Sequence, residues 1–203
     1  MATEIELKAH IKNIDELKCI LEKKAEYSGK FEKEDTYWIP NGKPDSRPDC
    51  DSSLEERYPL TKLRLRREKR EFPDGRVSSN AFATCKEKRV KDGIEENNEH
   101  EFEVRPTEEF EVFLRRMGFK PGASKKKRGW AYRCGEICAE LVEVIGLGWF
   151  IELEIILDDA RIKENSERAS QECRERLLDY LAELGISKES IESRYYTEML
   201  STL

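Results

Sequence analysis

The chain has 203 residues, enough for one large domain or two small ones. Charged side chains make up 39% of it, but 37 basic and 43 acidic residues leave a formal net charge of only −6. This balance argues against a protein that binds nucleic acid with its whole surface. No apolar run approaches the ~20 residues that span a membrane, and the first residues lack the basic and apolar regions of an export signal. We therefore expect no membrane segment and a cytoplasmic location.

The first strand is predicted over residues 4–11, where charged and apolar side chains alternate with a period of two. Glu4, Glu6 and Lys8 share one side of this strand, and Leu7 points to the other. Similar patterns predict strands over residues 34–39, 61–67, 81–89, 99–105, 124–134, 137–144 and 149–157.

A helix is predicted after the first strand, because Asn13 is a favourable N-cap and Glu16 completes a capping box. Thr107 is expected to cap a second helix. A third helix is predicted over residues 166–184, and residues 191–200 are expected to form a short helix or an extended arm.

Residues 40–59 interrupt the strand pattern. Four prolines punctuate this stretch, which is rich in Asp, Ser and Glu and is therefore predicted to be a long surface loop. Because strands of the same kind are predicted on both sides, we expect a single domain over residues 1–203 with an insertion at about 40–59.

One face of the predicted strands is charged. Its members are Glu4, Glu6, Lys8, Arg64, Arg66, Lys86, Glu101, Glu103, Lys126, Arg128, Glu152 and Glu154. The simplest interpretation is a half-solvated antiparallel sheet with a charged outer face. However, three amphipathic helices need an apolar surface, and only the opposite face of the sheet offers an extended one.

Helices on the apolar face would leave the charged side chains pointing away from them. About eight strands can curl until the sheet closes and loses its edges. We therefore predict an α+β fold: a closed eight-stranded antiparallel β-barrel with helices packed on the outside and the charged face lining a tunnel.

A tunnel with so many charges must hold water, metal ions or a charged ligand, because burying unpaired charge is costly. Lys and Arg bind phosphate oxygens. Clustered glutamates would repel phosphate unless a divalent cation lies between them, and Mg²⁺ or Mn²⁺ prefers carboxylate and phosphate oxygens. The pattern favours a metal–triphosphate complex as the ligand.

The predicted strands carry an ordered series of short motifs. They are Glu4-Ile5-Glu6-Leu7-Lys8, Asp35-Thr36-Tyr37, Leu63-Arg64-Leu65-Arg66, Thr84-Cys85-Lys86, Glu101-Phe102-Glu103, Lys126-Lys127-Arg128 and Leu147-Gly148-Trp149-Phe150-Ile151-Glu152-Leu153-Glu154. This series resembles the CYTH superfamily, the triphosphate tunnel metalloenzymes. Residues 144–154 and 194–200 look most like the class IV adenylyl cyclase branch. The eight-stranded tunnel of that family agrees with the fold predicted above.

The resemblance implies a role for each matching residue. Metal ligands for Mg²⁺ or Mn²⁺ would be Glu4, Glu6, Glu152 and Glu154, with Glu140 as a further candidate. The triphosphate would be bound by Lys8, Arg64, Arg66, Lys86, Lys126 and Arg128. Glu101 and Glu103 would bind metal-bound water or orient cationic side chains, or would serve only as counter-ions. Together with Glu4, Glu6 and Lys8, they form the predicted catalytic set.

One position departs from the resemblance. Relatives of the cyclase branch usually carry an aspartate a few residues before the Leu-Gly turn, where this chain has Val142. Glu140 would share the strand face of Val142 and could replace that ligand. The number of metal ions is therefore left open.

The resemblance implies a metal-dependent enzyme most like a class IV adenylyl cyclase, which converts ATP to cyclic AMP and pyrophosphate. The alternative is a triphosphatase that hydrolyses inorganic triphosphate, a nucleoside triphosphate or thiamine triphosphate. A non-catalytic module that binds polyphosphate or nucleotide is a third interpretation, although such a module has no evident use for clustered glutamates. Because dimers are usual among the cyclase relatives, a homodimer is left open.

Overall fold

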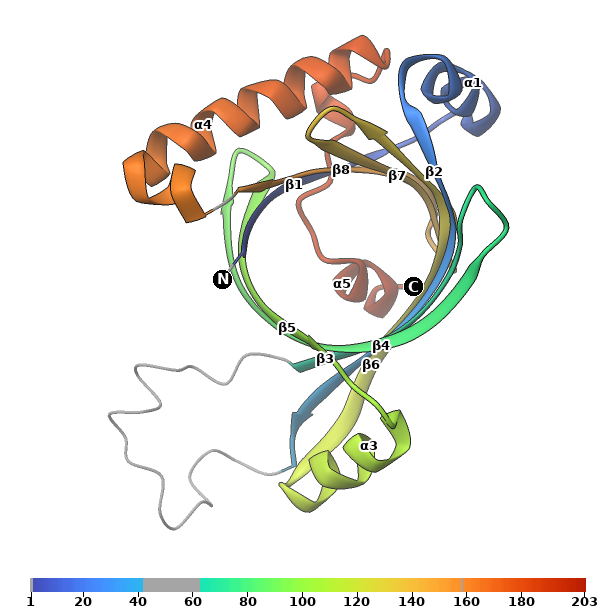
Figure 1. The fold of residues 1–203 in the computed structure, drawn as a ribbon, viewed down its shortest axis with the longest axis vertical. Coiled ribbons are helices and arrows are strands. Elements are labelled where there is room, and N and C mark those ends of the chain that lie inside the picture. The colour runs from blue at the N-terminus through green and yellow to red at the C-terminus, as the bar shows by residue number, and fades with distance from the viewer. Residues whose placement is uncertain (1, 42–62, 158) are drawn as a thin grey trace.

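The computed structural model describes residues 2–41, 63–157 and 159–203. Eight strands form a closed antiparallel barrel in the order β1-β5-β4-β3-β2-β6-β7-β8 (Figure 1). The strands are β1 (Ala2–His10), β2 (Glu26–Pro40), β3 (Leu63–Glu71), β4 (Val77–Lys91), β5 (Ile94–Glu103), β6 (Phe119–Cys134), β7 (Ile137–Val144) and β8 (Gly148–Leu157). The predicted fold class is thereby confirmed.

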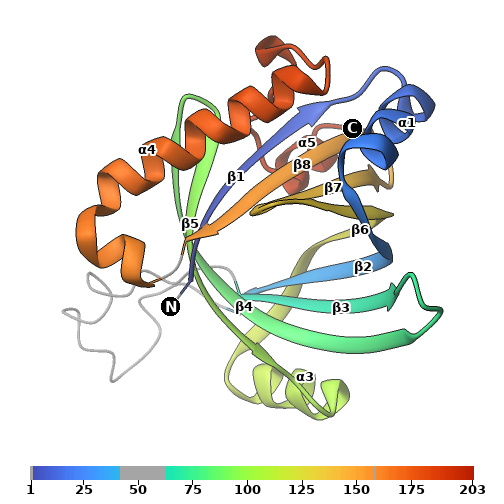
Figure 2. The ribbon, with the colours of Figure 1, turned by 45° about the horizontal axis from the view of Figure 1, so that its top comes forward.

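Among the described residues, three helices lie outside the barrel. They are α1 (Ile14–Lys24), α3 (Thr107–Arg116) and α4 (Asp159–Glu183). Helix α4 crosses the outer surface of β1 and β8, and α3 lies on the opposite side of the molecule (Figure 2). A short helix, α5 (Tyr196–Ser201), follows a 3₁₀ turn at Lys188–Ser190 and lies within the ring of strands when the barrel is viewed end-on (Figure 1).

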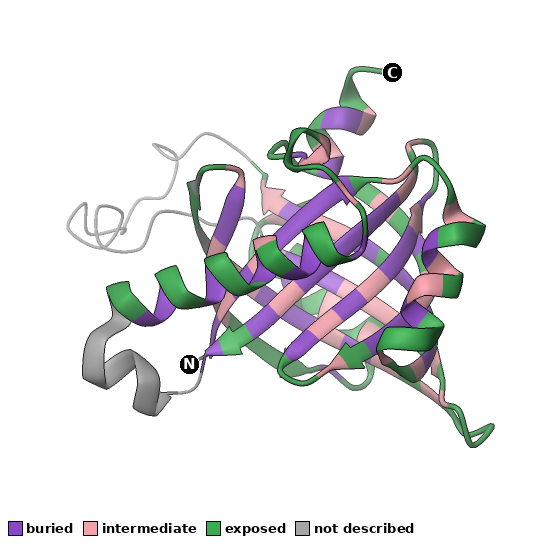
Figure 3. Ribbon diagram, turned by 90° about the horizontal axis from the view of Figure 1, so that it is seen from above, coloured by how far each residue is buried: buried purple, intermediate pink, exposed green. Residues whose placement is uncertain are grey.

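The main hydrophobic core lies between α4, α1 and the outer face of the barrel. Leu7 and Leu153, from the neighbouring strands β1 and β8, are fully buried there, as are Leu177 and Leu181 of α4 and Leu21 of α1. Figure 3 shows buried residues along the strands that α4 crosses. Since successive strand residues point to opposite faces, burial of one set outside directs the charged set inward.

The strand boundaries differ from the sequence prediction mainly in length. Strand β2 begins at Glu26 instead of residue 34, and β5 covers Ile94–Glu103 instead of residues 99–105. Asn13 caps α1 as predicted, its side chain accepting a hydrogen bond from the backbone N–H of Glu16. The prediction for Thr107 was wrong, because α3 begins at that residue and its N-cap is Pro106.

Two further observations concern the chain as a whole. Most of the predicted insertion at 40–59 falls outside the described residues. In the part of the chain that the structure describes, no helix has the length and apolar character needed to cross a membrane.

Candidate functional site

The inner face of the barrel surrounds a cavity of about 180 Å³. Every strand contributes at least one charged side chain to it, eight glutamates and seven lysines or arginines in all. They are Glu4, Glu6, Lys8, Lys33, Arg64, Arg66, Lys86, Glu95, Glu99, Glu101, Lys125, Lys127, Glu140, Glu152 and Glu154. The remaining lining residues are Tyr37 of β2 and Tyr195, Tyr196 and Thr197 of the C-terminal segment.

Most of the residues proposed from sequence meet at this cavity. The structure brings together Glu4, Glu6, Lys8, Arg64, Arg66, Lys86, Glu101, Glu140, Glu152 and Glu154. Glu103, at the end of β5, is exposed and does not line the cavity. The alternation of charges in the sequence thus identified the inner face on most of the strands.

The predicted orientation of Lys126 and Arg128 is wrong. Their side chains point outward and are 65% and 63% exposed, and they pair with Glu34 at 3.4 Å and Glu143 at 2.6 Å. The pairing of β6 with β2 puts Lys127 opposite Lys33, and both are buried inside the barrel. The cations of β6 that point into the barrel are therefore Lys125 and Lys127.

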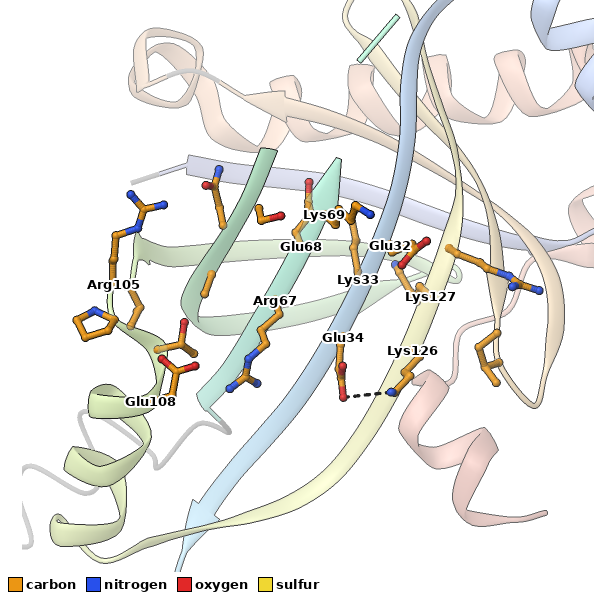
Figure 4. A pocket seen from close by; sticks show the side chains of 18 residues that line it. Glu32, Lys33, Glu34, Arg67, Glu68, Lys69, Arg105, Glu108, Lys126 and Lys127 are labelled. Atoms are coloured by element: carbon orange, nitrogen blue, oxygen red, sulfur yellow. Dashed lines mark ion pairs between the residues drawn. The ribbon is translucent and has the colours of Figure 1, made fainter. Parts of the chain in front are cut away.

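A second cavity, a groove of about 740 Å³, lies near α3. Figure 4 shows its lining, which combines side chains of β2, β3 and β6 with the segment before α3. Lys126 and Glu34 form an ion pair there, and Arg67 of β3 lies nearby. This groove carries mixed charge, and Lys33 and Lys127 contribute both to its wall and to the lining of the tunnel cavity.

Inside the tunnel, lysines and glutamates are closely paired. Lys8 contacts Glu95 at 2.6 Å, and Lys127 contacts Glu152 at 2.6 Å. Burial alone would raise the pKa of Glu152, but the charge of Lys127 outweighs it and lowers the pKa well below its ordinary value. Glu152 is therefore ionised over the whole neutral range.

Glu140 is held in the same way. Both of its oxygens accept hydrogen bonds from the ammonium group of Lys33, at 2.6 and 2.7 Å. Burial opposes ionisation of this carboxyl, but Lys33 and Lys127 lower its pKa overall. A metal ion at Glu140 would have to compete with Lys33.

A different environment surrounds Glu154. Burial and the neighbouring carboxylates of Glu4 and Glu6 raise the pKa of Glu154 to about 8. Lys86 only partly relieves this repulsion, lying 3.2 Å from Glu4 and 3.9 Å from Glu6. The donor set of oxygens with excess negative charge fits a hard divalent cation.

The spacing required by such a cation is not reached in this arrangement. Within residues 2–41, 63–157 and 159–203, no three acidic, cysteine or histidine side chains stand close enough to hold one metal ion. Lys86 also contacts Glu99. Metal binding would therefore require the Glu4 and Glu6 side chains to turn from Lys86 towards the ion.

One end of the barrel interior is apolar. Phe31, Val142 and Phe150 point inward there and pack against Tyr196 and Met199 of α5. Val142 is fully buried in this cluster, so it closes the tunnel where the sequence comparison suggested a metal ligand. Glu140 does share its strand face, as predicted.

The ring of Tyr196 separates the apolar end from the charged cavity. Three ammonium groups lie close to the centre of this ring, those of Lys8 at 5.5 Å, Lys125 at 5.2 Å and Lys127 at 5.7 Å. Such contacts stabilise cations that have lost part of their hydration. The cavity is thus bounded by a cluster of lysines around a phenol ring.

Several lining residues were missed from sequence. Lys33, Glu95, Glu99, Lys125 and Lys127 all face the cavity. The signal for Glu95 and Glu99 was their two-residue spacing from Glu101, hidden because the strand was predicted to begin at residue 99. Lys125 and Lys127 carried the same signal as Lys126 and Arg128, with opposite parity.

Comparisons with known proteins bear on the fold of this chain. No family model matches the sequence. A protein of Methanocaldococcus jannaschii named putative adenylate cyclase is 28% identical over 120 residues, or 59% of this chain. The chain matches 65% of the length of that relative.

Solved structures match over nearly the whole chain. The PH1012 protein of Pyrococcus horikoshii is 26% identical, with a TM-score of 0.71 over 96% of this chain and 98% of its own. A putative adenylate cyclase of Vibrio parahaemolyticus is 22% identical, with a TM-score of 0.71 over 98% of this chain and 97% of its own. The second likeness, at that identity, shows the fold.

Proposed function

We propose that this chain is a member of the CYTH superfamily and a divalent-metal-dependent enzyme that acts on the triphosphate of its substrate. One observation carries the proposal: eight glutamates and seven basic side chains, drawn from all eight strands, face one small cavity. A polyanion adds several negative charges to a lining that is already slightly acidic. A divalent cation bound with the substrate would offset that excess.

The basic residues bind and orient the phosphates. Arg64 and Arg66 offer planar guanidinium groups for paired contacts to phosphoryl oxygens, whereas Lys8, Lys86 and Lys127 act as point charges. Phosphoryl and nucleotidyl transfer depend mainly on positioning and charge neutralisation. These side chains would therefore supply most of the protein's contribution to catalysis.

The carboxylates divide into two groups. Glu4, Glu6 and Glu154 would hold Mg²⁺ or Mn²⁺, because their mutual repulsion already raises the pKa of Glu154. Bound there, the ion would neutralise charge on the phosphate oxygens. Glu152 and Glu140 each hold a lysine at 2.6 Å, so we assign them as partners of the phosphate-binding lysines.

The leading candidate reaction is that of a class IV adenylyl cyclase, supported by the name of the archaeal relative. In that reaction the ribose 3′-hydroxyl attacks the α-phosphorus of ATP, and pyrophosphate leaves. The chain's own contribution is to fix the triphosphate on Arg64, Arg66 and the tunnel lysines, so that the α-phosphorus meets the hydroxyl.

Triphosphate hydrolysis is the second candidate, and the size of the cavity favours it. At about 180 Å³ the cavity is smaller than the roughly 300–1,000 Å³ of pockets that enclose whole organic ligands. Its lining is almost entirely ionic, and α5 closes one end. Inorganic triphosphate, or the phosphates of a nucleoside or thiamine triphosphate, suit such a space better than a base and sugar.

Product analysis separates these candidates. The protein would be incubated with ATP, thiamine triphosphate or inorganic triphosphate plus Mg²⁺ or Mn²⁺, and the products resolved by ion-exchange chromatography. Cyclic AMP with pyrophosphate supports the cyclase, and orthophosphate without cyclic nucleotide supports the hydrolase. Absence of turnover with every substrate and ion contradicts an enzymatic role and favours a binding module.

A pair of variants controls this assay. Glu6→Gln removes an inward carboxylate and should abolish turnover, whereas Glu143→Gln removes an outward one that contacts Arg128 and should not. Equal activity of both variants would contradict the assignment of the tunnel as the active site.

A further inference from the structure

Asp35 occupies an unusual place in the tunnel wall. It lies on β2, its side chain has no exposed surface, and it is absent from the cavity lining. Its two oxygens accept hydrogen bonds from Nε and Nη2 of Arg66, at 2.7 and 2.9 Å. This paired contact fixes the plane of the guanidinium group as well as its position.

The same carboxylate also holds a lysine. The ammonium group of Lys125 lies 3.5 Å from Oδ2 of Asp35, on the strand that pairs with β2 on its other side. Lys125 and Arg66 both line the cavity, with side chains only 10% and 13% exposed. One buried carboxylate therefore supports two cations that face the candidate substrate.

Tyr37 completes the arrangement. It lies two residues after Asp35, lines the cavity, and accepts a hydrogen bond from Lys125. Burial raises the pKa of Tyr37, but Lys125 and Arg64 outweigh burial and lower it. Lys125 is thus held between a carboxylate behind it and a phenol oxygen beside it.

Electrostatics indicates why the carboxylate is needed. Two cations at the cavity wall would repel each other and would turn towards water without a common counter-ion. Burial opposes ionisation of Asp35, but Arg66, Lys125 and Arg64 hold its pKa well below the usual value. Asp35 therefore stays charged at every pH at which the protein is expected to act.

We propose that Asp35 is a positioning residue that fixes Arg66 and Lys125 in the orientation required by the triphosphate, without touching the substrate itself. This inference rests on the proposed function of the tunnel. It assigns a role to the Asp35-Thr36-Tyr37 segment beyond the substrate and metal contacts made by other residues.

Asp35→Asn tests the role, because it keeps the size of the side chain and removes its charge. Loss of a negative charge strengthens the general attraction for a polyanion and offsets the binding lost when Arg66 is misplaced, so KM should change little. Misplacement of Arg66 should lower kcat by about 10- to 100-fold, since small displacements of positioning groups cost that much. A merely structural role would reduce the folded fraction and leave kcat per folded molecule unchanged.

Glu96→Gln is the matched control. Glu96 accepts a hydrogen bond from the mostly buried Arg174 of α4, at 2.9 Å, and does not line the cavity. Its removal also leaves an arginine without its carboxylate, but outside the tunnel. We expect stability to change in this variant while kcat and KM stay within about twofold of the wild type.

Asp35→Glu provides a variant that keeps the charge and moves it by one methylene. It should fold if Asp35→Asn does not, and it should also lower kcat with little change in KM. In the Arg66→Gln background, Asp35→Asn should add less to the loss than it does alone, because the two residues act as a unit.

The outcomes are distinct. Wild-type kcat in both Asp35 variants overturns the inference alone, provided that the wild-type enzyme is active. A wild-type protein that neither binds inorganic triphosphate in calorimetry nor turns it or ATP over overturns the proposed function and the inference with it. If neither variant folds, Asp35 is a structural residue and the inference is wrong.

Discussion

Phe150 packs edge-on against Tyr196 inside the barrel, with 4.9 Å between their ring centroids. Phe150 belongs to β8, whereas Tyr196 begins α5 at the far end of the sequence. Both rings are buried. The C-terminal segment therefore lies inside the barrel and forms one wall of the candidate active site.

Tyr196→Ala should destabilise the protein by about 3 kcal/mol, the lower range for removing a buried aromatic ring. Urea unfolding followed by tryptophan fluorescence would measure the change. Tyr195→Ala is the adjacent control, since that side chain is 45% exposed, and it should cost less than about 1 kcal/mol. An equal loss of stability in both variants would contradict the placement of the Tyr196 ring between the apolar end of the barrel and the charged cavity.

Lys127→Met should lower kcat/KM by about 10²- to 10³-fold, the cost typical of removing one electrostatic contact from a transition state. Lys126→Met, the neighbouring substitution, should leave kcat/KM within about twofold because Lys126 points outward. Steady-state kinetics with the active substrate, on variants whose fold is checked by circular dichroism, would decide. A larger loss of kcat/KM in Lys126→Met than in Lys127→Met would instead support the inward orientation of Lys126 that was predicted from sequence.

Mg²⁺ and Mn²⁺ should bind more tightly as the pH rises from 6 to 8. The carboxyl of Glu154 has a pKa of about 8, and a protonated carboxyl must lose its proton before it can ligate a metal. The shift in melting temperature with metal concentration would report affinity at each pH. Glu154→Gln should weaken binding and flatten its pH dependence; an unchanged dependence would contradict Glu154 as a ligand.

Acid should loosen the C-terminal segment before it unfolds the barrel. Hydrogen bonds from Arg194, with a smaller contribution from His10, lower the pKa of Glu192 to about 2. A carboxyl with a depressed pKa stabilises the fold above its ordinary pKa of about 4.5, and this contribution is lost as the pH falls towards 2. Amide hydrogen exchange at Met199 should therefore accelerate over that range. In the Glu192→Gln variant, the Met199 amide should exchange faster than in the wild type at neutral pH as well.

The fold was predictable from sequence because the alternation of apolar and charged residues is regular on most strands. Where one parity is apolar, as at Leu7 and Leu153, the direction of each side chain is fixed by burial. The segment from Lys125 to Arg128 has no such asymmetry, because both parities are charged. Its orientation depends on register with β2, and that is a long-range property.

The site was predicted less completely for related reasons. Glu95 and Glu99 lie on a strand in which only Ile94 precedes an unbroken polar run from Glu95 to His100, so no alternation of apolar and charged residues marks this half of the strand. Residues 191–200 were expected to form a short helix or an extended arm, and Tyr196 was not assigned to the tunnel. Its place inside the barrel depends on the apolar residues at one end of the tunnel, which meet only after the sheet closes.

Closure of the barrel has a further consequence for how the protein can associate. Among the described residues, each of the eight strands has a hydrogen-bonded neighbour on both sides over part of its length, and only overhanging stretches such as residues 119–125 of β6 are paired on one side alone. Assembly by β-augmentation is thereby disfavoured for the described part of the chain. A partner that docks on the closed part of the barrel would therefore be recognised mainly through side chains.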